Sequence, residues 1–284
     1  MLQLELIMKH RIKMIGLDLD GTLLTDKKEL TDRTKAALRR AIELGITVLV
    51  ASGRPWMGVP EELRNFPGMR YALTSNGARI IDTKDDRVIE EHLLSPELAL
   101  KALAVCGKYD TLQEVYFDGQ GYAPEDQMAY VEKYHRNPSM CEYMRKTRLP
   151  VKDIRKLVEQ ENRGLDKVQA LFADMDERET AWKELEQEKG LELVGSLQYN
   201  IEINAAGVNK GTGLVNLGRM LGIRREEIMA FGDGDNDIAM LREAGFGVAM
   251  ANADEQVKAA ADYITLSNEE EGVAEAIERL VLKQ

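Results

Sequence analysis

Several features that define other classes of protein are scarce in this sequence. Its 284 residues include only two cysteines, Cys106 and Cys141, which are far apart and lack the spacing of metal ligands. The sequence therefore indicates a reduced protein rather than a disulfide-stabilised one, and we expect it to be cytoplasmic. The three histidines, His10, His92 and His135, form no cluster with each other or with the cysteines, so we interpret them as surface or structural residues.

Long apolar runs and an excess of positive charge are also missing. No stretch approaches the roughly 18 apolar residues of a membrane-spanning helix. Segment 1–8 contains acidic Glu5 and has no small-residue cleavage site, so it makes a poor signal peptide. With 38 Lys and Arg against 49 Asp and Glu, the formal net charge is -11, which argues against nucleic acid or an anionic membrane as the main partner. We expect a small-molecule partner, and the sequence leaves the oligomeric state open.

The rest of the composition, 44% hydrophobic and 31% charged residues, is that of a globular protein of one or two domains. Short apolar runs at 14–17, 46–51, 71–74 and 228–231 predict buried strands separated by helical patterns. Strand–helix–strand order predicts parallel strands whose carboxyl ends meet at one edge of a sheet. The segment between the third and fourth runs has mixed helix and strand patterns without a catalytic motif. We therefore predict one discontinuous domain, 1–90 with 201–284, and an inserted α+β domain, 91–200.

A pair of acids follows the first predicted strand. Asp18 and Asp20 flank Leu19, and Gly21 with Thr22 then turns the chain. Two ionised carboxylates this close repel each other unless a cation or a shared proton intervenes. Both arrangements suit phosphoryl transfer, because one carboxylate can attack phosphorus while a second acid protonates the leaving oxygen. An isolated Asp-x-Asp is more often a polar strand end before a glycine turn.

Polar residues also follow the second and third predicted strands. The hydroxyl of Ser52 and the backbone N–H of Gly53 suit a phosphate oxygen, although Ser-Gly after a strand is also a common turn. Arg54 is compatible with an exposed charge or with a substrate contact. Asn76, before Gly77, is compatible with a turn or with a ligand contact. These residues are therefore candidates for phosphate or substrate binding.

The strongest acidic cluster follows the fourth predicted strand. Asp233, Asp235 and Asp237 lie within five residues, and such a cluster is costly without a cation. Oxygen ligands completed by water describe a Mg²⁺ site, and the spacing is not that of an EF-hand loop. Upstream, Lys210 opens a predicted helix, where a positive charge is unfavourable for the helix dipole. Lys210 is therefore either a functional residue or an exposed lysine.

In combination, these motifs resemble those of the haloacid-dehalogenase-like (HAD) phosphohydrolases. The resemblance rests on Asp18–Leu24, Ser52, Lys210 and Gly232–Asp237, each at its expected place relative to a strand or helix. It implies an α/β fold, with a Rossmann-like core of parallel sheet and helices on both faces. It also implies that the inserted domain is an α+β cap of the C2B type, as in the Cof-type subfamily IIB.

The resemblance also implies roles for individual residues. Asp18 would be the nucleophile and Asp20 the acid and base, while the Asp18 carboxylate, the Asp20 backbone carbonyl and Asp233 would hold Mg²⁺. The remaining implied roles are a phosphoryl hydrogen bond from Ser52, charge compensation by Lys210, metal support by Asp237, a contact from Asn236 to the phosphate or to metal-bound water, and a position facing the site for Asn76.

The function that these roles imply is a Mg²⁺-dependent phosphatase of small phosphorylated metabolites. Sugar phosphates are the leading substrate class, and the reaction would pass through an aspartyl-phosphate. Two alternatives are a phosphomannomutase-like phosphotransferase and a non-catalytic phospholigand-binding protein. The intact set of Asp18, Asp20, Lys210 and Asp233 counts against the second alternative. No cap segment carries a readable code for the substrate.

Overall fold

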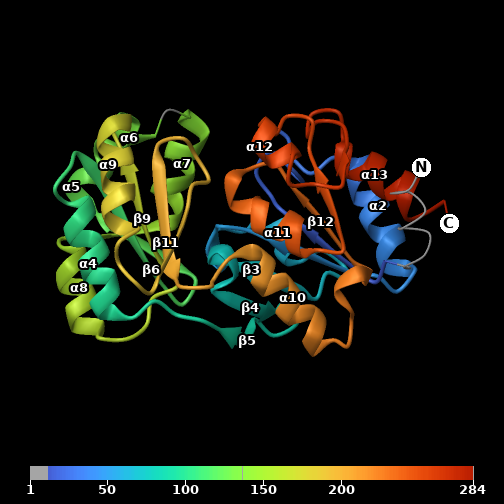
Figure 1. Cartoon of the computed structure of the whole chain (residues 1–284), viewed down its shortest axis with the longest axis horizontal. Helices are drawn as coiled ribbons and strands as arrows, with labels where there is room; N and C mark the ends of the chain where they lie inside the picture. Colours follow the sequence, from blue (N-terminus) through green and yellow to red (C-terminus); the bar gives the residue numbers. More distant parts are fainter. Residues whose placement is uncertain (1–11, 136, 284) are drawn as a thin grey trace. The chain divides into compact units, whose positions relative to one another are not determined.

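The computed structural model describes residues 12–135 and 137–283, which form two compact units (Figure 1). The core unit comprises the chain up to Gly53, Pro60–Glu90 and the chain from Asn209 onward. The inserted unit comprises Arg54–Val59 and Glu91–Val208. The N-terminal segment and His10 lie outside the described residues. Within the described ranges, none of the helices has the length and apolarity that crossing a membrane requires.

The core unit is built on an eight-stranded sheet, and the six strands from β14 to β3 in its spatial order are parallel. The remaining two strands lie at one edge, where β4 pairs antiparallel with β3. In spatial order, the strands are β14 (Tyr263–Ile264), β13 (Phe246–Ala249), β12 (Ile228–Gly232), β1 (Met14–Leu17), β2 (Thr47–Ala51), β3 (Tyr71–Thr74), β4 (Arg79–Asp82) and β5 (Arg87–Glu91).

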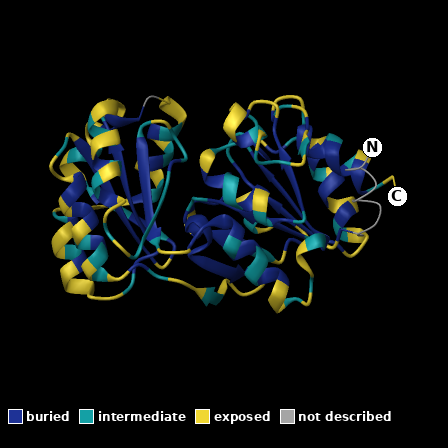
Figure 2. Cartoon of the chain, in the orientation of Figure 1, coloured by how far each residue is buried: buried dark blue, intermediate teal, exposed yellow. Residues whose placement is uncertain are grey.

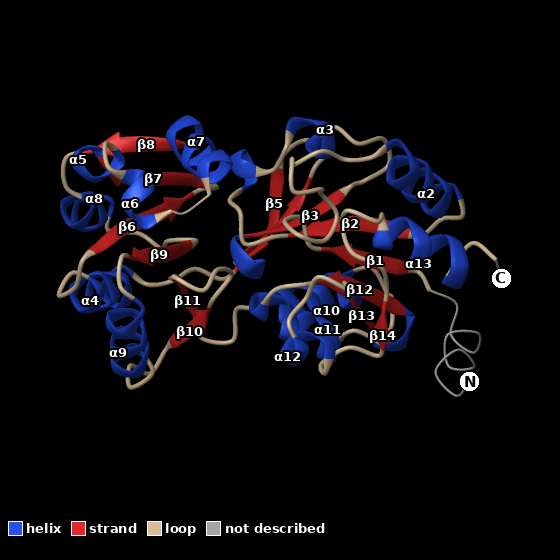
Figure 3. Cartoon of the chain, turned by 90° about the horizontal axis from the view of Figure 1, so that it is seen from above, coloured by secondary structure: helices blue, strands red, loops and turns tan. Residues whose placement is uncertain are grey.

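Helices cover both faces of this sheet, as Figure 3 shows. α2 and α13 pack against each other on one face, whereas α10 and α11 pack against each other on the opposite face. The helices of the core unit are α2 (Asp32–Glu43), α3 (Glu61–Arg64), α10 (Lys210–Met220), α11 (Ile238–Glu243), α12 (Glu255–Lys258) and α13 (Gly272–Leu280), with short 3₁₀ turns η2 (Ser75–Gly77), η3 (Arg225–Glu227) and η4 (Asp235–Asp237).

The alternation of side chains along β1 determines the direction in which Asp18, the polar residue that follows the strand, points. Met14 packs with Leu214 of α10 in one apolar cluster, and a Cβ on Gly16 would lie 2.8 Å from a methyl carbon of Leu214. These two residues therefore face α10, while Ile15 and Leu17 face the other side. All four are buried, as are most strand residues (Figure 2). Asp18 continues the same alternation toward the helix that begins at Lys210.

The start of α10 is fixed by a capping box. The side chain of Asn209 accepts a hydrogen bond from the backbone N–H of Thr212 at 2.9 Å. In return, the hydroxyl of Thr212 accepts one from the backbone N–H of Asn209 at 3.2 Å. This reciprocal pair defines the first turn of the helix. Lys210 is therefore held at the first helical position, at the carboxyl edge of the sheet.

The inserted unit is an α+β structure built on a mixed sheet. One sheet face packs its apolar residues, including Val115, Phe117 and Val168, against helices α4, α8 and α9. The sheet order is β10 (Leu191–Val194), β11 (Asn200–Ala205), β9 (Lys167–Phe172), β6 (Thr111–Phe117), β7 (Gln120–Pro124) and β8 (Arg148–Val151). The helices are η1 (Trp56–Gly58), α4 (Pro96–Cys106), α5 (Glu125–Met128), α6 (Val131–Tyr134), α7 (Pro138–Thr147), α8 (Ile154–Glu161) and α9 (Met175–Leu185).

The boundaries of the inserted unit differ from the predicted 91–200. β11 pairs antiparallel with β9 inside this sheet, so the chain returns to the core unit at Asn209. The segment Arg54–Val59 also belongs to the inserted unit. Both differences arise from pairing and packing with distant segments, which the local pattern of strand residues does not specify.

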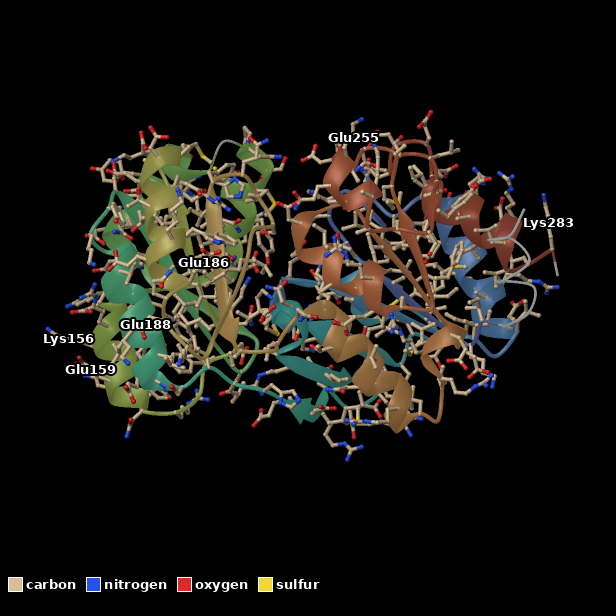
Figure 4. All side chains as sticks on the ribbon, viewed as in Figure 1. Lys156, Glu159, Glu186, Glu188, Glu255 and Lys283 are labelled. Atoms are coloured by element: carbon tan, nitrogen blue, oxygen red, sulfur yellow. The ribbon has the colours of Figure 1, made fainter. Side chains whose placement is uncertain are left out.

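Much of the charge of the protein lies on the outer surfaces of the helices. The labelled side chains of Lys156, Glu159 and Glu255 project from α8 and α12 in Figure 4, and all three residues are exposed. Lys156, whose side chain is 73% exposed, lies 3.8 Å from Asp153. Exposed pairs of this kind contribute about 0–1 kcal/mol each. The fold therefore depends mainly on its apolar clusters, and buried charges need a separate explanation.

A matched pair of glycine variants tests how closely η2 approaches α10. At Gly77 φ is +94° and an added Cβ would lie 2.7 Å from the carbonyl oxygen of Asn209, whereas at Gly45 φ is +81° and nothing lies within 4 Å of the added Cβ. Both Gly→Ala changes carry the strain of the left-handed region, about 1–2 kcal/mol. Overpacking should cost Gly77→Ala about 1–3 kcal/mol more in urea denaturation. Equal losses for the two variants would contradict the close approach.

Candidate active site

Three elements meet at the carboxyl edge of the core sheet, and a buried lysine joins them. The ammonium group of Lys210 lies 2.5 Å from Asp18 Oδ1 and 2.7 Å from Asp237 Oδ1. Asp18 follows β1, Asp237 lies in η4 after β12, and Lys210 begins α10. Lys210 is fully buried, and Asp18 is 6% exposed. The structure therefore brings together acids that are more than two hundred residues apart in the sequence.

Asp237 also organises the loop that follows β12. Its second oxygen, Oδ2, accepts hydrogen bonds from the backbone N–H groups of Asp233 and Gly234, each at 3.0 Å. An added Cβ on Gly232 would lie 2.3 Å from Cβ of Asp237, so a side chain at position 232 would displace this carboxylate. Asp237 therefore holds both Lys210 and the loop that carries Asp233, and Asp18 and Asp233 stay the candidates for direct metal ligands.

Asp233 links the loops after β12 and β1. Its Oδ1 accepts a hydrogen bond from the hydroxyl of Thr22 at 2.6 Å. Asn252 donates to the carbonyl of Gly21 at 2.8 Å and lies 3.5 Å from Asp233 Oδ2. Gly21 has φ +84°, and a Cβ there would lie 2.1 Å from Asp233 Oδ2. Only glycine allows both this backbone conformation and this close approach.

The acidic cluster carries more negative charge than its lysine compensates. One carboxylate oxygen from each of Asp18, Asp233 and Asp237 lies within 4.8 Å of the others. Burial raises the pKa of Asp18 well above its usual range, although Lys210 opposes this effect. Burial and then the charge of Asp237 raise the pKa of Asp233 to about 7. Clustered carboxylate oxygens with raised pKa values fit a hard divalent cation, which would favour their ionised forms.

Lys210 itself is held in its charged form. Burial alone would lower its pKa, but Asp18 and Asp237 outweigh burial and raise the pKa above its ordinary value. A buried ammonium group with two carboxylate partners satisfies the requirement that buried charges be paired. The alternative of an exposed lysine at the helix start is therefore wrong for Lys210.

Three further predicted residues lie at neighbouring strand ends. The backbone carbonyl of Ser52 accepts a hydrogen bond from the N–H of Asn76 at 3.0 Å. The side-chain amide of Asn236 donates to that of Asn76 at 3.4 Å. Ser52, Asn76 and Asn236 are all buried. Asn76 has φ +61° and follows Ser75 with φ +51°, and such left-handed residues are typical of turns at functional sites.

The remaining predicted residues, Gly53, Arg54 and Asp20, do not belong to this buried group. Gly53 is the last core residue before the first segment of the inserted unit. Arg54 belongs to the inserted unit, where its guanidinium lies 4.5 Å from the ring centre of Tyr143 and donates to the carbonyl of Gly58 at 3.0 Å. A substrate contact by Arg54 stays a prediction. Asp20 does not join the three clustered carboxylates but pairs with Lys28 at 2.7 Å.

The sequence indicated no role for Thr22 or Lys28, although each contacts a site loop. It predicted Asn252 only as a neighbour of the site, in a loop at the same sheet edge, and Asn252 does contact Gly21 and Asp233 there. Thr22 is part of the first motif, but its partner Asp233 lies 211 positions away. Lys28 was one of several charged residues after that motif. The available signal was position alone, because these residues lie in loops at the carboxyl edge of the sheet. The predicted structural role of His135 agrees with its burial and its 2.9 Å hydrogen bond to Tyr199.

Comparison with known proteins now identifies the family. The family model of haloacid dehalogenase-like hydrolases matches residues 15–277. The chain belongs to this family. A relative from Bacillus subtilis (strain 168), the 5-amino-6-(5-phospho-D-ribitylamino)uracil phosphatase YcsE, is 33% identical over 271 residues, which are 95% of this chain and 96% of the relative.

Solved structures agree with this assignment. A haloacid dehalogenase-like hydrolase from B. subtilis superposes with a TM-score of 0.85 at 30% identity, covering 95% of this chain and all (100%) of the other. A HAD subclass IIB sugar phosphatase has a TM-score of 0.77 at 25% identity, covering 94% of this chain and 98% of the other. The family, the α/β fold with an α+β insertion and the enzyme class predicted from the sequence, a HAD-type phosphatase, are thereby confirmed.

Replacing the buried lysine should destabilise the metal-free protein. Lys210→Met keeps an unbranched side chain of similar length but leaves the carboxylates of Asp18 and Asp237 without their shared cation. Removing one partner of a buried charge pair costs about 3–5 kcal/mol. We expect the free energy of unfolding, measured in urea with EDTA present, to fall by this amount. Lys152→Met changes an exposed lysine and should leave this free energy almost unchanged. A Lys210→Met variant as stable as the unmodified protein would refute the proposed charge balance.

The raised pKa of Asp233 predicts a pH-dependent stability. Because this pKa is about 7 in the folded protein and 3.8 as an ordinary value, the folded state binds more protons between these pH values. The stability of the metal-free protein should therefore fall as pH rises through this window. Asp233→Asn imitates the protonated acid, so the stability of this variant should depend less on pH. At pH 8 its free energy of unfolding should exceed that of the unmodified protein by at least about 1.4 kcal/mol, the equivalent of one pKa unit. Parallel stability–pH curves for both proteins would contradict the assignment.

Proposed function

We propose that this protein is a Mg²⁺-dependent phosphatase that hydrolyses sugar phosphates and related small phosphorylated metabolites through an aspartyl-phosphate on Asp18. The observation that carries the proposal is the buried Asp18 carboxylate. It lies at the end of a parallel strand, 2.5 Å from Lys210 and grouped with Asp233 and Asp237. A nucleophilic carboxylate needs this combination of exact placement and compensating positive charge.

The residues that would hold Mg²⁺ are Asp18 and Asp233 through their carboxylates and Asp20 through its backbone carbonyl. Asp237 would support them by fixing Lys210 and the loop that carries Asp233. The bound ion would supply positive charge that offsets the charge of the phosphate and of the ionised cluster. The oxygen-only donor set and the raised pKa values of Asp18 and Asp233 are what support this assignment.

In the first step, an Asp18 oxygen attacks phosphorus and the bond from phosphorus to the leaving oxygen breaks. Asp20 donates its proton to that oxygen, so an alcohol leaves and Asp20 becomes a carboxylate. Lys210 stabilises the Asp18 carboxylate and keeps the reacting oxygen in place. The Ser52 hydroxyl and the Gly53 N–H would hold the phosphoryl oxygens, with Asn236 and Asn76 beside them.

In the second step, water attacks phosphorus and the bond between phosphorus and Asp18 breaks. Asp20, now ionised, accepts a proton from the water, and inorganic phosphate leaves. This transfer restores the carboxylate of Asp18 and the proton of Asp20, so the cycle closes without another reactant.

The substrate class is supported by two named proteins. The relative YcsE carries a name that specifies a phospho-D-ribitylamino compound, and the subclass IIB neighbour is named a sugar phosphatase. Both names point to a phosphate on a hydroxylated carbon chain. We extend this class to the present protein and propose that it acts in the cytoplasm. The location is supported by two free, buried cysteines, of which Cys106 has a pKa raised to about 12 by burial.

Phosphate release from a panel of substrates tests the function. The panel comprises sugar phosphates, sugar-alcohol phosphates, nucleotides and pyridoxal phosphate, each with Mg²⁺ or with EDTA. Asp18→Asn should lower turnover by at least about 10³-fold, because removing a covalent nucleophile has effects of this size or larger. Asp235→Asn changes an exposed acid of the same region and serves as the control. We also expect acid-quenched wild-type protein, but not the Asp18→Asn variant, to retain labelled phosphate.

Each result has a definite meaning. No release from any compound would refute the phosphatase. A near-normal rate for Asp18→Asn would refute the covalent mechanism. Release that EDTA does not affect would refute the metal requirement.

A further inference from the structure

A tight turn after the first motif holds a lysine in an unusual backbone conformation. The carbonyl of Thr25 accepts a hydrogen bond from the N–H of Lys28 at 2.8 Å, and the N–H of Thr25 donates to the carbonyl of Glu29 at 3.1 Å. These two bonds define a three-residue turn whose last residue, Lys28, has φ +64°. Glycine or asparagine is the usual residue at such a position. A lysine there suggests that its side chain matters.

The side chain of Lys28 pairs with a central residue of the proposed mechanism. Its ammonium lies 2.7 Å from Oδ1 of Asp20, and the two side chains are 28% and 33% exposed. Asp20 also bridges Leu24, which leads into the turn. The lysine therefore reaches back across a single short loop. The neighbouring Lys27 is exposed and provides a natural comparison.

The turn is anchored to the rest of the core unit. Asn268 donates from its side chain to the carbonyl of Leu24 at 3.1 Å and to Asp26 Oδ1 at 3.2 Å. The N–H of Asn268 donates to Asn252 Oδ1 at 3.1 Å, and Asn252 in turn donates to the carbonyl of Gly21 at 2.8 Å. The same two asparagines thus hold the turn and the loop that contains Asp20.

We propose that Lys28 is a positioning residue for Asp20, fixing the carboxyl group that protonates the leaving oxygen. The inference rests on the proposed function, in which Asp20 is the acid. An exposed ion pair of this kind adds little to stability. Its effect on the reaction can be larger, because proton transfer requires the acid within hydrogen-bond reach of the leaving oxygen. Asn268 and Asn252 hold the backbone of the turn in place, so the ammonium group of Lys28 can hold Asp20 in one position.

The test compares two leaving groups in variants of Lys28. p-Nitrophenyl phosphate releases a stable phenolate that needs no proton, whereas glycerol phosphate or a sugar phosphate releases an alkoxide that does. The ratio kcat/KM reports the steps up to phosphorylation of Asp18, which include this proton transfer. We expect Lys28→Met to lower kcat/KM about 10-fold or more for the alkyl substrate, within the range of acid catalysis. For p-nitrophenyl phosphate we expect a change below about 3-fold, since that substrate does not depend on the acid.

Two further variants and one physical measurement complete the design. Lys28→Arg keeps the charge and should restore most of the activity toward the alkyl substrate. Lys27→Met should behave like the unmodified protein. The thermal midpoint of Lys28→Met should stay close to that of the unmodified protein, because an exposed ion pair is lost.

The outcomes separate this inference from the proposed function. Equal losses for both substrates would mean a merely structural role and would overturn the inference, as would no loss for either substrate or a faster alkyl reaction. In each of these cases the phosphatase assignment stands. If the unmodified protein releases phosphate from neither substrate nor from the wider panel, the proposed function fails and this inference fails with it.

Discussion

The active-site region depends on one buried interaction, the contact of Lys210 with Asp18 and Asp237. A lysine at the first position of a helix opposes the helix dipole, and its burial costs hydration energy. Two carboxylates at 2.5 and 2.7 Å compensate both effects. The contact forms only if β1 points Asp18 toward α10 and if α10 begins at Lys210. The side-chain alternation of β1 and the capping box of Asn209 are therefore part of the site.

The same interaction requires the surrounding loops to approach closely. A side chain at Gly232 would displace Asp237, and a side chain at Gly21 would occupy the space of Asp233. Gly77 brings its own turn against the first turn of α10. One glycine at the end of β12 and two glycines in turns thus allow carboxylates and a lysine to share a small, largely buried volume. Pre-organisation here comes from the absence of side chains as much as from the hydrogen bonds.

The sequence was sufficient to predict which residues meet at the site when their positions follow from the direction of the strands. Asp18, Ser52 and Asp233 each follow an apolar run, and parallel strands bring such ends to one edge. The contacts of Thr22 and Lys28 were not predictable, because they depend on how loops fold across that edge. The boundary at Asn209 was missed for a related reason. In β11 the apolar residues Ile201 and Ile203 alternate with polar ones and are equally compatible with either sheet.

Buried charges are balanced in the inserted unit but not in the core unit, and this difference supports a bound cation in the core unit. In the inserted unit, Arg148 pairs with Glu114 and Lys167 with Glu202, each at 2.6 Å, so each buried cation has one buried acid. At the carboxyl edge of the core sheet, one buried lysine serves a cluster of three acids. Paired charges are complete as they stand, whereas the core cluster reaches neutrality only by binding protons or a further cation. The raised pKa values of Asp18 and Asp233 mean that protons would supply part of the missing positive charge. A bound divalent ion, as proposed above, would instead leave Asp18 ionised.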